Sequence, residues 1–203
     1  MRKNSKGFSL IEILIVLAIV GLTVALLSQR IGKNEGREMR RDVRIFAAQI
    51  RDLRNKARMR NATFRLVINM PEDTKEKQSY WVESSSRNAL ITYDQDELKR
   101  RRENLREEDK DKDPSGFEAD KELSKGGPQP LSNGLIFKSV EIAAQKKEYT
   151  AGRVYIHFFP EGRVEEAVVH ISDGDKLNWS LAIHPRTGRV DLINKEKKLK
   201  DFQ

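Results

Sequence analysis

The sequence predicts an α+β protein in which a long N-terminal helix packs on antiparallel β-sheet. Three observations indicate this class. An apolar run of helical length lies near the N-terminus, a charged segment with an apolar stripe of period 3.6 follows it, and the remainder alternates apolar and polar residues between turn signals. The 203 residues have room for one ordinary domain with appendages, and the absence of cysteine excludes disulfides and thiolate metal sites.

The first element is the apolar run at residues 8–27. As a helix it would be about 30 Å long, which is one hydrocarbon thickness. Three basic residues and no acid lie in residues 1–6, so we expect this flank to stay in the cytoplasm and the bulk of the chain to cross. The end of the run has only a poor version of a signal-peptide cleavage site, which favours a retained transmembrane helix.

Glu12 is the one charged residue within this run. A charge at the centre of a membrane helix costs about 2.5–3.5 kcal/mol, and such residues are candidates for a function. The alternative is that Glu12 lies close enough to the cytoplasmic face for its carboxylate to reach water.

The second element is an amphipathic helix expected over residues 28–60. Its apolar stripe consists of Val43, Phe46, Ala47, Ile50, Leu53 and Ala57. Gly32 and Gly36 weaken the helix by about 1 kcal/mol each relative to alanine. The segment holds eleven Lys and Arg against four Asp and Glu, and its one aromatic residue, Phe46, belongs to the apolar stripe, so no aromatic side chains interleave with the arginines on the charged face. A solvated or partner-facing helix face is therefore favoured over a nucleic-acid site.

Residues 61–194 predict a β domain. Runs typical of strands lie at residues 62–68, 79–83, 134–142, 153–159, 164–172, 177–184 and 189–193. Short turn signals separate the last four runs, which predicts antiparallel neighbours. We expect one twisted sheet or two small ones, with the helix stripe across one face.

Two segments of this half are strongly polar. Residues 94–130 are predicted to be an insertion, because the segment has too few apolar residues for their burial to offset the entropy cost of ordering the chain. We expect a short helix within it, near residues 97–108. The insertion is either solvated or an arm that a partner orders. Residues 195–203 form a basic tail, and we expect it to be solvated.

The stretch GFSLIE at residues 7–12, followed by the apolar run, resembles the class III signal of type IV pilins and type II secretion pseudopilins. The resemblance implies a pilin-like fold and a leader peptide at residues 1–7. It also implies that prepilin peptidase cleaves between Gly7 and Phe8 and methylates Phe8. In the family, the glutamate at the position of Glu12 is thought to neutralise the new terminal amine of a neighbouring subunit. Because Phe8 and Glu12 are i and i+4, Glu12 could instead face its own amine.

The C-terminal half resembles the minor pseudopilin H of type II secretion, and also the related minor pilin T. The resemblance rests on VYIHFFPEGR at residues 154–163 and TGRV at residues 187–190. Pro160, Gly162 and Gly188 form turns in these motifs, and a structural role suffices for all three.

These resemblances imply a minor pseudopilin in a heteromeric filament with other major and minor pseudopilins. We expect a single-pass protein of the bacterial inner membrane, with a cytoplasmic N-terminus and a periplasmic domain that is later extracted into the pseudopilus. Secreted cargo and the outer-membrane secretin are further candidate partners. The alternative is a minor type IV pilin that acts in pilus assembly, adhesion or DNA uptake.

Other chemistry is weakly indicated. The three histidines, His157, His170 and His184, lie on three predicted strands, and alternation places His157 among apolar neighbours without a nearby acid. A metal site there is disfavoured. Asp173 and Asp175 are too few ligands for calcium. We expect no catalytic residues, no cofactor and no enzyme activity, because no nucleophile–base pair or phosphate loop stands out.

Nucleic acid is likewise a disfavoured partner. The feature that keeps it open is the basic tail, whose lysines are Lys195, Lys197, Lys198 and Lys200.

Overall fold

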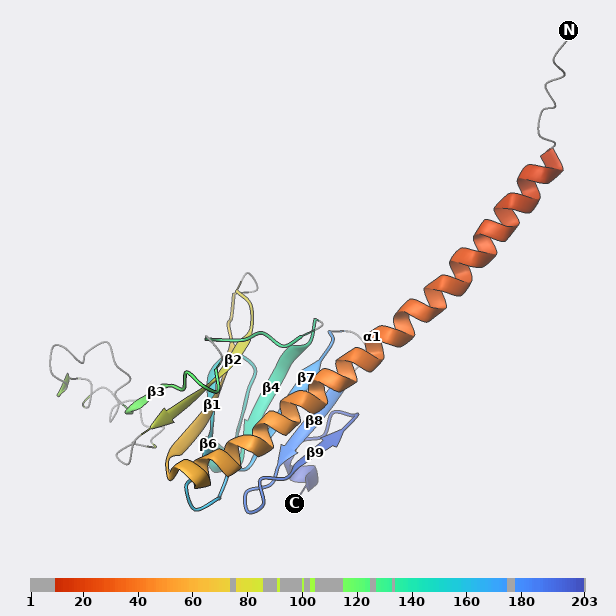
Figure 1. Ribbon diagram of the computed structural model, residues 1–203. Coiled ribbons are helices and arrows are strands. Elements are labelled where there is room, and N and C mark those ends of the chain that lie inside the picture. The colour runs from red at the N-terminus through yellow and green to blue at the C-terminus, as the bar shows by residue number, and fades with distance from the viewer. Residues whose placement is uncertain are drawn as a thin grey trace, which may run out of the picture. The chain divides into compact units, whose positions relative to one another are not determined.

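The computed structural model describes residues 10–73, 76–85, 91, 100, 103–104, 115–124, 127–132, 134–174 and 178–202, with the side chains of residues 25–36 outside that description. The chain divides into two compact units, Met1–Arg41 and Asp42–Gln203. Figure 1 shows the helices and strands of these units.

Helix α1 comprises Leu10–Arg60, and its backbone stays helical through the two glycines at 32 and 36. The predicted stripe is confirmed, because its six residues are each at most 4 % exposed. The helix ends in a left-handed residue, Asn61, with φ 48°. The N–H of Asn61 bonds Arg58 and the N–H of Ala62 bonds Ala57, so the last carbonyls are satisfied as in a Schellman motif.

Besides α1, the described residues of the second unit form two antiparallel sheets and two short 3-10 helices, Ala143–Gln145 and Leu199–Phe202. The first has the order β3-β2-β1-β6 and consists of β1 (Thr63–Met70), β2 (Ser79–Ser85), β3 (Phe117–Ala119) and β6 (Gly152–Phe158). The second has the order β5-β4-β7-β8-β9 and consists of β4 (Ile136–Ile142), β5 (Lys147–Tyr149), β7 (Ala167–Ser172), β8 (Asn178–Ile183) and β9 (Val190–Ile193). The α+β class with antiparallel sheets is therefore confirmed.

All seven predicted strands are present, but one predicted pairing is wrong. The turn after β6 was expected to make β6 and β7 neighbours, whereas β6 pairs with β1 and β7 pairs with β4 and β8. The turn does close, because the N–H of Phe159 bonds the carbonyl of Arg163. Among the described residues, a single isolated β-bridge, between Phe158 and Val164, extends the pairing across this turn. The chain crosses between the sheets here because β1 offers β6 a full ladder.

The short strands β3 and β5 were not predicted. Strand β3 lies inside the polar insertion, where Phe117 is buried and Arg65 of β1 packs against its ring at 4.2 Å. The Arg65 guanidinium also lies 4.4 Å from the ring of Tyr155 and pairs with Glu83. Residues 115–124 are thus packed on the first sheet, contrary to a wholly solvated insertion. Most of the expected helix at residues 97–108 lies outside the described residues.

Phe46 of α1 joins the helix to both sheets. Its ring centroid lies 4.9 Å from Tyr80 of β2 and 5.6 Å from Phe137 of β4, in edge-to-face geometry. Such pairs contribute about 0.5–1.5 kcal/mol beyond their buried area. In Figure 1 the C-terminal part of α1 runs across strands of both sheets. The helix therefore closes the core of the second unit.

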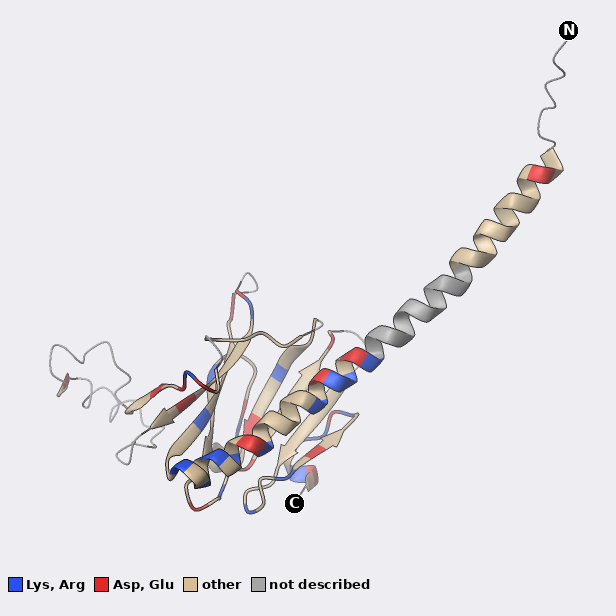
Figure 2. Cartoon of the chain, in the orientation of Figure 1, with Lys and Arg blue, Asp and Glu red and all other residues tan. Residues whose placement is uncertain are grey.

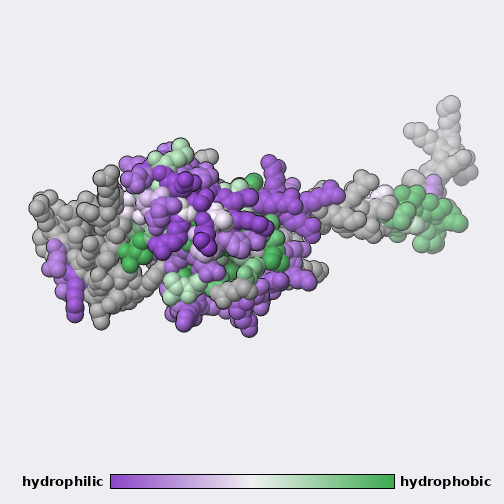
Figure 3. Space-filling view, turned by 90° about the horizontal axis from the view of Figure 1, so that it is seen from below, coloured by the Kyte–Doolittle hydropathy of each residue, from purple (hydrophilic) through white to green (hydrophobic). Residues whose placement is uncertain are grey.

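In the first unit, the side chains of Leu10 to Val24 are exposed, and Figure 3 shows the apolar surface that they form. No helix among the described residues is both long and apolar enough to span a bilayer. The transmembrane helix at residues 8–27 stays a prediction, since Phe8 and Ser9 lie outside the described residues.

Candidate functional site

The processing signal lies at the N-terminal end of the first unit. Gly7 and Phe8 fall outside the described residues, so the predicted cleavage and methylation positions have no described geometry. Glu12 lies in the first described turn of α1 with its side chain exposed. A carboxylate near a helix N-terminus is favoured by the helix dipole, and the amine that cleavage would create is a second positive charge near it.

In the second unit, two of the predicted turns meet the same arginine of α1. The Arg54 Nε donates to the carbonyl of Gly162 at 2.7 Å, and its Nη2 donates to the carbonyl of Arg186 at 3.4 Å. The turn after β6 and the turn before β9 are thus both bound to one guanidinium. We call this arrangement the Arg54 clasp.

The two glycines of the clasp are needed for two reasons: the backbone is left-handed at both positions, and an arginine side chain of α1 lies close to each. Gly162 has φ +88° and Gly188 has φ +63°, a region that L side chains rarely adopt. A Cβ at Gly162 would lie 2.9 Å from Cδ of Arg58, and a Cβ at Gly188 would overlap Cδ of Arg54. Pro160 lies in the turn that Gly162 ends. The turns could be predicted from their proline and glycine residues. Arg54 could not, because it lies at the flank of the buried stripe and no sequence pattern marks it.

The three histidines do not converge, and each has a carboxylate partner. His157 Nδ1 lies 2.8 Å from Glu165, so the prediction that His157 lacks a nearby acid is wrong. The turn at residues 159–163 returns Glu165 to β6, where its N–H bonds the carbonyl of His157. In the second sheet, His170 Nε2 lies 3.0 Å from Glu141. In the third pair, Nε2 of His184, directly after β8, lies 2.9 Å from Asp191 of β9.

The described residues hold no cluster of three or more metal-ligating side chains. Of the short acidic turn, Gly174 has φ +84° and its N–H bonds the Ser172 hydroxyl at 3.0 Å, which describes an ordinary turn. Asp175 lies outside the described residues.

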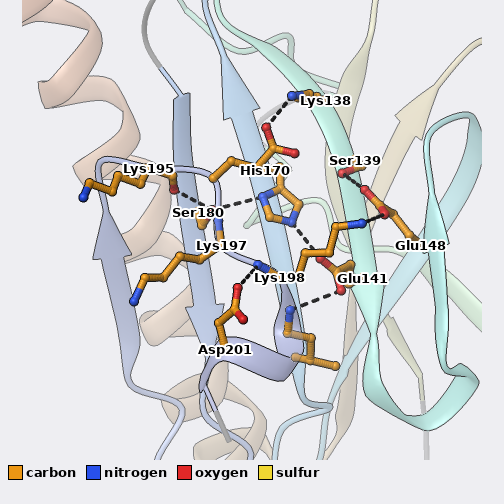
Figure 4. A network of polar contacts seen from close by, with 12 residues as sticks. Lys138, Ser139, Glu141, Glu148, His170, Ser180, Lys195, Lys197, Lys198 and Asp201 are labelled. Atoms are coloured by element: carbon orange, nitrogen blue, oxygen red, sulfur yellow. Dashed lines mark hydrogen bonds and ion pairs between the residues drawn. The ribbon is translucent and has the colours of Figure 1, made fainter.

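The C-terminal tail is bound to the second sheet, contrary to the solvated tail that was expected (Figure 4). Ser180 of β8 donates its hydroxyl hydrogen to the carbonyl of Lys195 at 2.8 Å and accepts the N–H of Lys197 at 2.9 Å. The N–H of Leu199 bonds Glu141 at 3.2 Å. Nδ1 of His170 lies 3.0 Å from the same Ser180 hydroxyl oxygen.

Hydrogen bonds at the rim of this network lower the pKa of two carboxyl groups. A hydrogen bond from the Ser139 hydroxyl, followed by one from Lys198, lowers the pKa of Glu148. A hydrogen bond from Lys138 lowers the pKa of Glu196. Lys198 is therefore engaged with the domain, whereas Figure 4 shows the side chains of Lys195 and Lys197 extending away from Glu141 and Glu148.

A cavity of about 260 Å³ lies between α1, β2, residues 122–124 and Gln129. Its wall includes Tyr80, whose hydroxyl bonds Gln49 at 3.2 Å, and an ion pair between Lys56 and Asp52 at 2.9 Å. Burial is the main cause that raises the pKa of Tyr80. In this wall, Tyr80 is thus paired with Gln49, and Lys56 with Asp52.

Comparison with known families adds one match. Residues 2–28 match the model of the prokaryotic N-terminal methylation motif, which is typical of type IV pilins and pseudopilins. The matched residues include Gly7, Phe8 and Glu12. No curated protein and no solved structure matches the chain. The match supports a type IV pilin-like or pseudopilin protein and implies processing by prepilin peptidase and assembly with other pilin-type subunits.

Proposed function

We propose that this chain is a minor pseudopilin of a type II secretion system, a structural subunit of the periplasmic pseudopilus. The observation that carries the proposal is the methylation motif at residues 2–28, which is followed by a helix whose C-terminal part is buried in a two-sheet domain. The likeness of residues 154–163 and 187–190 to pseudopilin H supports the choice of subunit.

In this proposal, prepilin peptidase cuts after Gly7 and methylates Phe8. The new amine is a positive charge at the edge of an apolar helix, and Glu12 supplies the opposite charge. Two unpaired charges in an apolar bundle are each costly, so pairing them fixes the register of one subunit on another. The pair forms either between neighbouring subunits or within one helix at i,i+4 spacing.

The second unit would then transmit force. A filament subunit is held by its helix, so load on the helix must reach the domain without separating the two. The buried stripe supplies the area of contact, and the Arg54 clasp adds two directed bonds to turns of different strands. The protein has no catalytic role in this account, and it is the substrate of an enzyme.

The proposed location is the bacterial inner membrane, with residues 1–7 in the cytoplasm and the domain in the periplasm. Charge alone does not set this orientation, because residues 28–47 hold six Lys and Arg against three in residues 1–6. Protease added to spheroplasts tests it. We expect digestion of the domain, and a fully protected domain would overturn the proposed orientation.

The second candidate is a minor type IV pilin, since the C-terminal motifs are shared with pilin T. If its role were DNA uptake, Lys195, Lys197 and Lys200 would be the cations available at the tail, because Lys198 pairs with Glu148. Retardation of DNA at low salt that is lost on replacing these three lysines with alanine would favour this candidate. Absence of retardation by the wild-type chain would remove DNA uptake from consideration.

Intact mass and N-terminal sequencing of the protein from its host membranes test the proposed processing. A terminus at methylated Phe8 is expected. A terminus at Met1, or beyond Leu27, would contradict the filament role. Deletion of the gene then separates the two candidates: loss of protein secretion with normal piliation supports the pseudopilin, and the reverse supports the pilin.

A further inference from the structure

The solvent face of α1 in the second unit has its own regular pattern. Opposite the buried stripe lies an exposed line of residues spaced three and four apart, which we call the outer ridge. The outer ridge consists of Ile45, Ala48, Asp52, Asn55 and Met59. This spacing is that of the a and d positions of a heptad, the positions that face a partner helix.

The outer ridge carries two large apolar side chains that are exposed and contribute little to the buried core of the domain. Ile45 is 46 % exposed and Met59 is 84 % exposed. Among the described residues from 42 to 202, only two other large apolar side chains, Ile91 and Ile136, are exposed. Half of that exposed set therefore lies on one line of one helix. Between Ile45 and Met59 lie Ala48, Asn55 and Asp52, whose carboxylate pairs with Lys56.

One flank of the outer ridge is an unbroken row of arginines. Arg44, Arg51 and Arg58 are seven residues apart, at every g position of the same heptad, and all three are exposed. Figure 2 shows in blue the Lys and Arg positions along this part of α1. Successive arginines lie about 10.5 Å apart along the helix. Within the described part of the chain none of the three forms an ion pair. Because g positions pair with charges on a facing helix, the row selects an acidic partner.

The same charges oppose a second copy of this chain. In a parallel pair, Arg51 at g would face Lys56 at e of the other copy. In an antiparallel pair, arginine would face arginine. Like charges at these positions disfavour pairing. A lipid surface would also attract the arginines, but it has no reason to require heptad spacing.

We infer that the outer ridge and its arginine row form a docking seam for a helix of a different polypeptide, one that carries Asp or Glu at heptad spacing along the flank facing Arg44, Arg51 and Arg58. This inference rests on the proposed role as a filament subunit and names the kind of neighbour it takes. A subunit with this seam sits beside a different, acidic subunit and not beside itself.

The test measures binding of the full-length chain in phosphatidylcholine nanodiscs to two labelled helical peptides. Both peptides carry apolar residues at a and d, and they differ only in having Glu or Lys on the facing flank. We expect the Glu peptide to bind about tenfold more tightly at low salt. The triple variant Arg44→Glu, Arg51→Glu, Arg58→Glu should reverse the preference. Equal binding of the two peptides by the wild-type chain would overturn the inference.

A control separates the arginine row from net charge. Lys147→Glu, Lys195→Glu, Lys200→Glu makes the same change in net charge at exposed sites of the second sheet and the tail and should keep the preference for the Glu peptide. If it also reverses the preference, the seam is not the site. Because Arg58 packs against Gly162, the double variant Arg44→Glu, Arg51→Glu gives a smaller reversal without touching the clasp.

Two further outcomes identify other occupants. The chain has no cysteine, so Ala48→Cys reports only its own neighbours. A disulfide-linked homodimer on oxidation in membranes would overturn the choice of a different polypeptide. Binding to phosphatidylglycerol vesicles but to neither peptide would overturn it in favour of lipid. The result is independent of processing: methylated Phe8 without peptide preference removes the seam alone, and an unprocessed terminus with the preference removes the filament role alone.

Discussion

The signal at residues 7–12 is a linear sequence, whereas the Arg54 clasp joins residues 108 and 132 positions apart. In the proposed function, prepilin peptidase recognises the first before any filament forms, and this recognition needs only the right residues in order. The second exists only when two turns of different strands have folded against α1. Changes in the signal should therefore abolish a biological step, whereas changes in the clasp should lower a free energy of unfolding.

The largest expected effect follows from Gly7→Val. A branched side chain beside the scissile bond obstructs the close backbone approach that glycine allows. We expect the precursor to accumulate with its leader attached, as measured by intact mass. Gly21→Ala is the matched control, since a Cβ at Gly21 has no atom within 4 Å. Normal processing of Gly7→Val would show that the motif is not used.

Glu12→Leu should separate processing from assembly. The variant keeps the apolar helix and the cleavage site, so we expect a mature terminus at Phe8. Assembly should fall strongly, because the terminal amine loses its opposite charge. Shear-released filament protein, compared with the membrane fraction, measures the loss. Normal secretion and normal filament yield by Glu12→Leu would contradict the charge-pairing account.

The clasp is tested by Gly188→Ala. This change combines a left-handed backbone with overlap of the Arg54 side chain, and we expect a cost of about 3 kcal/mol in the free energy of unfolding. Gly174→Ala is a matched control, because Gly174 has φ +84° and open space around its Cβ position, and it should cost only about 1 kcal/mol. Denaturation followed by the fluorescence of Trp81 and Trp179 reports both sheets.

A second mutation isolates the arginine. In an Arg54→Ala background, Gly188→Ala should cost clearly less than in the wild type, since the overlap with Cδ is gone and only the Cβ of residue 54 remains, at 3.3 Å. The difference is a coupling energy between α1 and the turn before β9. An unchanged cost would mean that the backbone of the turn, and not the close approach of Arg54, determines the need for glycine.

These expectations also show what the sequence could predict. The buried stripe of α1 and the seven longer strands follow from local periodicity, which is why all were found. The division into two sheets does not, because β6 finds its partner in β1 about ninety residues earlier, and no local signal records that choice. The acid beside His157 was missed for the same reason: alternation describes the strand but not the residue that a turn brings back to it.

A smaller effect is expected at the tail. Ser180→Ala removes a buried hydroxyl that serves Lys195, Lys197 and His170 at once. Leaving these groups without their partner should cost about 1–3 kcal/mol, with faster hydrogen exchange at the Lys197 amide. Ser132→Ala, in a loop, provides a comparison at a serine outside this network. Unchanged exchange at Lys197 would mean that the tail is held by other contacts.

The smallest effect is the acid sensitivity of the tail. The pKa values of Glu148 and Glu196 are lowered in the folded chain, mainly by hydrogen bonds from Ser139 and Lys138 respectively. Their stabilising contribution is therefore complete above the ordinary value of 4.5 and is lost as pH falls through the lower folded values. We expect exchange protection of the Leu199 amide, relative to that of the core strands, to fall below pH 4.5 in wild type. In Glu148→Gln combined with Glu196→Gln, protection should be weaker at pH 7 and change less on acidification. If both chains lose protection equally, Glu148 and Glu196 do not set the acid response of the tail.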